Sequence, residues 1–257
     1  MNNPRFARLQ QSLQQGFSLD PKVIFKEAWA RINGAKLPLL LAALGMVGFT
    51  IAGSLLLTAL TSEGEAAQVT IVTTLFNFVF VVLIAVLNTA LELMGVHRAV
   101  NKPIRATQIF DCFTFMLPIA MAYLLMLIGM AVLVVVTTAL GLPLMASMGL
   151  VGILMISMSF SFLLIVDKGL KPLAAILTSM RLFARQWWQL LLIYLLSTLL
   201  VIVAAFSFGI LLIWAIPLYI TIKGIVYREA CGVEGPSSNE ALISTPSLNT
   251  SKDKFEA

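Results

Sequence analysis

Six apolar stretches of membrane-crossing length dominate the chain and limit what it can fold into. They lie near residues 37–60, 69–91, 117–140, 147–166, 187–206 and 210–227. A bilayer core about 30 Å thick needs roughly 20 helical residues to cross it, and each stretch is close to that length. None of them alternates apolar and polar residues as a barrel strand would. The sequence therefore predicts an all-α polytopic membrane protein with six transmembrane helices.

The composition agrees with this class. Hydrophobic residues make up 60% of the chain and charged residues only 11%, whereas soluble domains carry about 25% charged residues. Cys112 and Cys231 are too few for a disulfide framework. The net charge of +5 could suggest a nucleic-acid partner, but the basic residues follow the predicted spans instead. We therefore expect membrane lipids, and no nucleic acid, as partners.

All 17 Lys and Arg residues fall on one side of the predicted spans. Six precede the first span. The others lie in the second connection, in the fourth connection and from the end of the last span onward. The first, third and fifth connections contain none. Because cytoplasmic loops carry the Lys and Arg excess, we predict three hairpins with both termini in the cytoplasm. The first apolar stretch is too long and too far from the start for a signal peptide.

A basic amphipathic segment lies between the fourth and fifth spans. From Pro172 onward, Arg181 and Arg185 share one predicted helix face. The apolar stripe opposite them consists of Leu173, Ile176, Leu177, Met180, Phe183 and Ala184. Such a helix is typical of the membrane interface, with cations toward phosphates and the stripe toward acyl chains. Trp187 and Trp188 then mark the headgroup level.

A similar segment begins at Pro21, after Asp20 as a predicted N-cap. Its apolar stripe is Phe25, Ala28, Trp29 and Ile32. A weaker copy begins at Pro103. We therefore predict a unit of interfacial helix plus hairpin, used three times and related about an axis along the membrane normal. The alternative is that any inner loop tends to be basic and amphipathic. The predicted lipid-headgroup contacts are Arg31, Lys171, Arg181, Arg185, Trp187 and Trp188.

Asn77, Asn88 and Glu92 form a polar stripe on the second span. Their separations place them within about 60° of one another on a helix, and polar groups in lipid are expensive. The stripe should therefore face the inside of a helix bundle. It can serve as a path for protons, ions or headgroups, or it can make interhelical hydrogen bonds with Glu92 near Arg98 or solvent. We expect Lys223, in the last span, to extend toward the interface.

The stretch IVDKGLKPLAAILTSMRLFARQWWQLLLIYLL, with a Pro-containing last span, resembles uncharacterised bacterial six-pass membrane families. These include the YciC-like inner-membrane proteins and the membrane domain that accompanies some glycerophosphodiester phosphodiesterases. FKEAWARINGAKLPLLL is similar to the opening of the same families. The resemblance covers most of residues 20–230 and implies a bacterial inner-membrane location. It carries no catalytic residues, and no phosphodiesterase domain is recognisable.

The sequence offers little for catalysis. A single histidine, His97, excludes sites with several His ligands, and nucleotide-binding glycine motifs are absent. We predict no catalytic, cofactor or metal site and hence no enzyme. The expected domains are an N-terminal cytoplasmic segment (1–19), a membrane domain (20–230) and a disordered cytoplasmic tail (231–257). Two functions remain open: a protein that organises or senses the cytoplasmic leaflet, or a small transporter or channel that uses the polar stripe. Homo-oligomerisation is left open.

Overall fold

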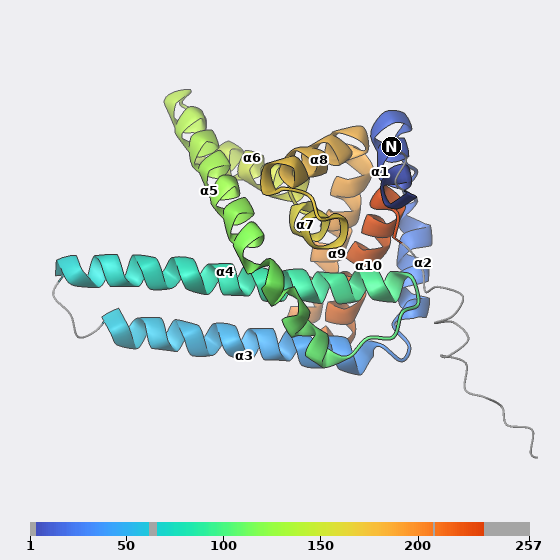
Figure 1. Cartoon of the computed structure of the whole chain (residues 1–257), viewed down its shortest axis with the longest axis horizontal. Helices are drawn as coiled ribbons and strands as arrows, with labels where there is room; N and C mark the ends of the chain where they lie inside the picture. Colours follow the sequence, from blue (N-terminus) through green and yellow to red (C-terminus); the bar gives the residue numbers. More distant parts are fainter. Residues whose placement is uncertain (1–3, 62–65, 208, 234–257) are drawn as a thin grey trace, which may run out of the picture.

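The computed structural model describes residues 4–61, 66–207 and 209–233 (Figure 1). Every regular element within these residues is a helix. In chain order they are α1 (Pro4–Gln15), α2 (Pro21–Arg31), α3 (Lys36–Thr61), α4 (Ala66–Ala99), the 3-10 helix η1 (Ala106–Phe115), α5 (Met116–Ala139), α6 (Leu144–Ser157), α7 (Ser161–Lys168), α8 (Pro172–Arg185), α9 (Trp187–Phe206) and α10 (Leu212–Cys231). The predicted all-α class is confirmed.

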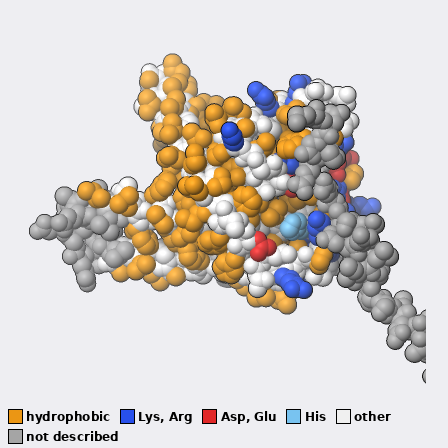
Figure 2. Space-filling model, viewed as in Figure 1, with side chains coloured by type: hydrophobic (Ala, Val, Ile, Leu, Met, Phe, Trp, Pro, Cys, Tyr) orange, Lys and Arg blue, Asp and Glu red, His pale blue; other side chains and the backbone are white. Residues whose placement is uncertain are grey.

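Five segments of the described residues are long and apolar enough to cross a membrane. They are Lys36–Ala59, Thr73–Ala99, Ala106–Ala139, Leu144–Lys168 and Trp187–Phe206. Hydrophobic side chains cover much of the face seen in Figure 2, and these segments are those of a multi-pass membrane protein. The predicted sixth span, 210–227, is not among them, because its helix α10 carries Lys223, Arg228 and Glu229.

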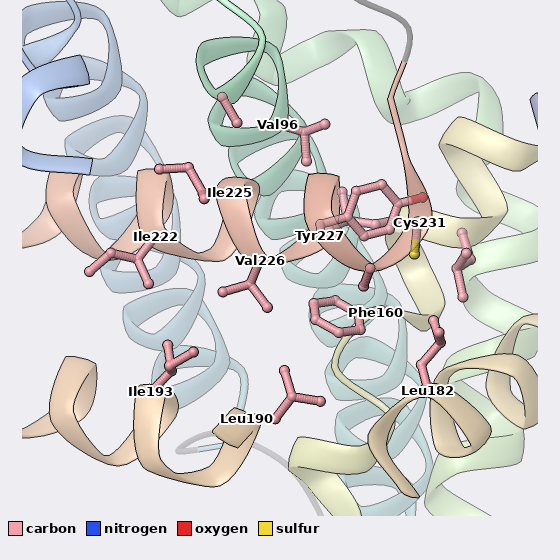
Figure 3. Packing of buried hydrophobic residues seen from close by; sticks show 14 of the residues in the cluster. Val96, Phe160, Leu182, Leu190, Ile193, Ile222, Ile225, Val226, Tyr227 and Cys231 are labelled. Carbon is pink, nitrogen blue, oxygen red and sulfur yellow. The ribbon is translucent and has the colours of Figure 1, made fainter. Parts of the chain in front are cut away.

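Helix α10 forms the centre of the protein. Every residue from Ile220 to Tyr227 is buried, and the helix contacts α2, α3, α4 and α9. Figure 3 shows its side chains packed among Val96 of α4, Phe160 and residues of α8 and α9. A helix surrounded by lipid would expose an apolar face, so α10 belongs to the core over this length.

The hairpins do not lie parallel to one another. Helices α3 and α4 run side by side, whereas α5 leaves them at a steep angle and α9 and α10 stand across α4 (Figure 1). The Nζ of Lys36, at the start of α3, lies 5.7 Å from the ring centroid of Trp214 near the start of α10. A short helix precedes each of α3, α5 and α9, but the three predicted hairpins of six spans are not confirmed, because α10 is not among the candidate spans. The predicted parallel arrangement of three repeats is not confirmed.

The starts of both predicted amphipathic helices agree with the structure. Pro21 opens α2, and the backbone N–H of Lys22 donates to Oδ1 of Asp20 at 2.9 Å, so Asp20 is the N-cap. Pro172 opens α8. Proline suits this position because the missing N–H would have no partner in the first turn.

Two features were not predicted. The N-terminal segment contains α1, which packs against α8 and α10 and helps to bury Leu9, Phe17 and Leu19. The fourth span is broken, because α6 ends at Ser157 and α7 begins at Ser161. The predicted disordered tail lies outside the described residues beyond Val233.

Candidate functional site

A buried ion pair joins α4 to α10. The Nζ of Lys223 contacts Oε1 of Glu92, and the two side chains are only 10% and 9% exposed. The amide of Asn88 also donates to Oε1 of Glu92, at 2.8 Å. The other carboxylate oxygen, Oε2, is buried and has no partner among the described residues. Because an isolated charge in an apolar interior is very costly, each member of the pair depends on the other.

Two glycines allow the helices to approach this closely. A Cβ added to Gly95 of α4 would collide with the backbone oxygen of Ile220, and one added to Gly224 of α10 would collide with the backbone of Gly95. The two backbones are therefore in direct contact at the crossing. Gly95 lies one helical turn after Glu92, and Gly224 directly follows Lys223, so the crossing fixes the ion pair.

The structure brings together only part of the predicted polar stripe. Asn88 and Glu92 bond to each other, but Asn77 is exposed. The prediction that Lys223 extends toward the interface is wrong, because Lys223 is buried on Glu92. Arg98 was a predicted partner of Glu92, yet its guanidinium donates to backbone oxygens of the α2–α3 region instead. The stripe splits because α10 covers only the C-terminal half of α4.

The space beside the ion pair is small. A cavity of about 10 Å³ is lined by Lys223, Tyr194, Ser197 and Tyr219, together with apolar residues. That volume corresponds to roughly one water molecule. In this conformation the ion pair is consequently a packed structural contact, with no room for a solute next to Lys223.

Hydrogen bonds from α8 and α9 hold the break in the fourth span. The hydroxyl of Ser179 on α8 donates to the carbonyl of Ser157 at 2.7 Å and accepts from the N–H of Phe160 at 3.2 Å. The hydroxyls of Ser159 and Tyr194 lie 2.9 Å apart and share a hydrogen bond. Exposed backbone groups inside a membrane protein must find such partners. Sequence reasoning missed both Ser179 and Tyr194, since neither belongs to a motif.

Helix α8 is turned differently from the sequence prediction. Its buried residues are Ala175, Ile176, Ser179 and Leu182, while the predicted stripe residues Leu173 and Leu177 are 57% and 45% exposed. Met180 and Phe183, predicted to face acyl chains, pack against the protein core. Small side chains let α8 approach α5, α6 and α7, and hydrophobicity alone does not reveal such a face.

The exposed surface of α8 and the start of α9 is cationic and aromatic. Lys171, Arg181 and Arg185 are exposed, and none forms an ion pair with any described residue. No acidic residue occurs anywhere between Asp167 and Glu229. Trp187 and Trp188 follow at once, 53% and 60% exposed, with their ring centroids 5.6 Å apart. We call Lys171, Arg181, Arg185, Trp187 and Trp188 the cationic surface.

Arg31, the remaining predicted headgroup contact, is engaged within the protein. Its Nε donates to Oε1 of Glu27 and its Nη1 to Oδ1 of Asn101, both at 2.7 Å. Glu27 also accepts two hydrogen bonds from Arg228, at 2.7 and 3.0 Å. The hydrogen bond from Arg228 is the largest cause of a lowered pKa at Glu27, and burial opposes it. Arg31 therefore ties α2 to the end of α4.

Comparison with known protein families, with curated proteins and with solved structures finds no match to this chain. The resemblance to six-pass bacterial families thus stays a prediction. The function is therefore inferred from the positions and contacts of the residues described above.

Proposed function

We propose that the protein is a non-catalytic multi-pass membrane protein that organises or senses the cytoplasmic leaflet of a bacterial inner membrane, by binding anionic lipid headgroups on its cationic surface. One observation carries the proposal: Lys171, Arg181 and Arg185 are exposed cations without an acidic partner among the described residues, and two exposed tryptophans follow them at the start of α9. Cations beside interfacial tryptophans are suited to lipid phosphates.

The way in which α8 is held by the rest of the protein supports the same function. No acidic residue lies between Asp167 and Glu229 in the sequence, so no acidic side chain on α8 or α9 offsets the charge of these cations. Here the opposite face of α8 is anchored in the core through Ser179 and Leu182. The cations are therefore carried on a fixed element, and each one near an anionic membrane surface contributes about 1 kcal/mol.

The orientation belongs to the proposal. The Lys and Arg distribution supports a cytoplasmic position for the cationic surface and the N-terminus. We propose the cytoplasmic side for the ends of α2 and α8.

Lipid retention tests the function. The full chain is purified in mild detergent with equal amounts of phosphatidylglycerol and phosphatidylcholine, and bound lipid is measured by native mass spectrometry. Replacing Arg181 and Arg185 with Glu reverses two charges and should lower the preference for phosphatidylglycerol by at least about tenfold. Lys at both positions should preserve the preference. A matched control is Lys26→Glu, which changes an exposed cation on α2. Unchanged preference in the double Glu variant would refute the proposal.

A second candidate function is transport of a proton, an ion or a lipid-related solute. The observation that favours it is the broken fourth span, whose Ser159 bonds Tyr194 next to the cavity at Lys223. Broken helices line the binding sites of several transporter folds. Proton and ion flux into liposomes should then require Glu92, and Glu92→Leu with Lys223→Met, which removes both charges together, should abolish it while the protein stays folded. Unchanged flux in the variant, or equal flux for the unaltered protein and protein-free liposomes, would exclude this candidate.

A further inference from the structure

A groove of about 470 Å³ lies where α3, α4 and α5 meet. Its lining comprises Leu57, Thr73, Thr74, Asn77, Phe78, Val81, Tyr123 and Leu127. The α4 and α5 residues belong to the candidate spans Thr73–Ala99 and Ala106–Ala139. The groove lies on helices other than those that carry the cationic surface. It opens within segments that are long and apolar enough to cross a membrane.

The groove combines apolar walls with uncharged polar groups. Four of its side chains carry hydroxyl or amide groups, and none is ionised at neutral pH. Among the described residues, the structure gives the Asn77 amide and the Tyr123 hydroxyl no hydrogen-bond partner. Asn77 is also exposed on the surface of α4. A polar side chain that faces lipid without a partner is unfavourable, so an occupant that supplies partners is favoured.

We propose that this groove binds an uncharged lipid that carries free hydroxyl or ester groups, such as a diacylglycerol. The amide of Asn77 donates to an ester carbonyl or accepts from a hydroxyl, and Tyr123 does either from the opposite wall on α5. Leu57, Val81 and Leu127 border the acyl chains. An ionised headgroup is disfavoured because the lining offers it no counter-charge. The volume falls within the range of small-molecule sites.

Photo-crosslinking of the full chain in phosphatidylcholine liposomes tests this site. The probe is a diacylglycerol with a diazirine near its glycerol, and labelled peptides are mapped by mass spectrometry. Labelling should concentrate on residues 73–81 and 123–127. Asn77→Leu and Tyr123→Phe should each lower it about fivefold, as expected for the loss of one neutral hydrogen bond. Val81→Trp should fill the groove and lower labelling further.

Leu124→Trp is the matched control, because Leu124 is 48% exposed on α5 and does not line the groove. It should leave labelling unchanged. Equal labelling of the chain and of Asn77→Leu would overturn the proposal, as would stronger labelling by a phosphatidylglycerol probe at the same peptides. A dimer in detergent that Asn77→Leu dissociates would also overturn it, since the groove would then be covered by a second copy. Size-exclusion profiles confirm that each variant is folded.

Discussion

The ammonium of Lys223 on α10 contacts the carboxylate of Glu92 on α4, although 131 positions separate the two residues. This contact explains why a basic residue can stay buried in the last helix. It also explains why α10 lies in the core: the charges that weaken it as a membrane span are neutralised inside the protein. Neighbouring backbones touch at Gly95 and Gly224, so the pair and the crossing form one structural unit.

Removal of one member of the pair should be strongly destabilising. Lys223→Met would leave the Glu92 carboxylate buried without a counter-charge, and we expect a loss of about 3–5 kcal/mol. The double variant Glu92→Leu with Lys223→Met removes both charges and should recover most of that loss. Unfolding in mixed micelles followed by circular dichroism measures both. If the double variant were as unstable as the single one, the pair would have a role other than mutual neutralisation.

The glycine crossing predicts a steric effect that depends on position. Gly95→Ala places a methyl group against the backbone of Ile220 and should separate α4 from α10, with a large loss of monodisperse protein. Gly149→Ala on α6 meets nothing within 4 Å, and it should be neutral or slightly stabilising because alanine favours helices by about 1 kcal/mol. Size-exclusion chromatography after detergent extraction distinguishes the two. Comparable yields of both variants would argue against the close crossing.

The broken fourth span should depend on the Ser179 hydroxyl. Ser179→Ala removes only the hydroxyl and leaves the Ser157 carbonyl and the Phe160 N–H without this partner, at a cost of about 1–3 kcal/mol for each buried group. Thr178→Val alters the neighbouring position, which makes no hydrogen bond at the break, and should cost little. Hydrogen exchange at residues 158–161 should quicken only in the Ser179 variant. Identical exchange in both would mean that the hydroxyl does not hold the break.

Acid should weaken the contact of α2 with α10. The pKa of Glu27 is lowered from its ordinary value of 4.5, first because Arg228 donates to the carboxylate. A carboxyl group with a lowered pKa in the folded state binds protons more readily when unfolded. Its contribution is therefore complete above pH 4.5 and is lost as the pH falls through the lower folded value. Unfolding free energies across this range should show a smaller acid loss in Glu27→Gln. An unchanged profile would contradict this assignment.

The sequence predicted five of its six apolar spans and the starts of α2 and α8 correctly, because those depend on local chemistry. Runs of about 20 apolar residues and a proline after an N-cap have the same meaning in most contexts. The prediction failed where tertiary packing determines which face of a helix is buried. The buried face of α8 contains Ala175 and Ser179, whose small size permits close approach but adds little hydrophobicity. At α2, Ala28 and Ile32 of the predicted stripe are buried, but Trp29 is 61% exposed.

The ion pair was only half visible in the sequence. The sequence shows Glu92 as a charge in an apolar span, but it predicts that Lys223 extends toward the interface. Opposite charges in two membrane-length segments are a signal for pairing, but the sequence also offered Arg98 and solvent to Glu92. Lys223 is the partner of Glu92 because the backbones of Gly95 and Gly224 are in contact. Two glycines 129 positions apart in the sequence do not indicate such a contact.

In the proposed arrangement, the cationic surface meets lipid phosphates while the other face of α8 is held in the protein. Single spin labels at residues 174, 175, 181, 182 and 185 test this arrangement in liposomes that contain phosphatidylglycerol and a nickel-chelating lipid. Labels at the exposed positions 174, 181 and 185 should be relaxed by headgroup nickel, and those at the buried positions 175 and 182 should be immobile and unaffected. If positions 181 and 185 instead respond only to a water-soluble nickel complex, α8 lies away from the membrane surface and the proposed function is wrong.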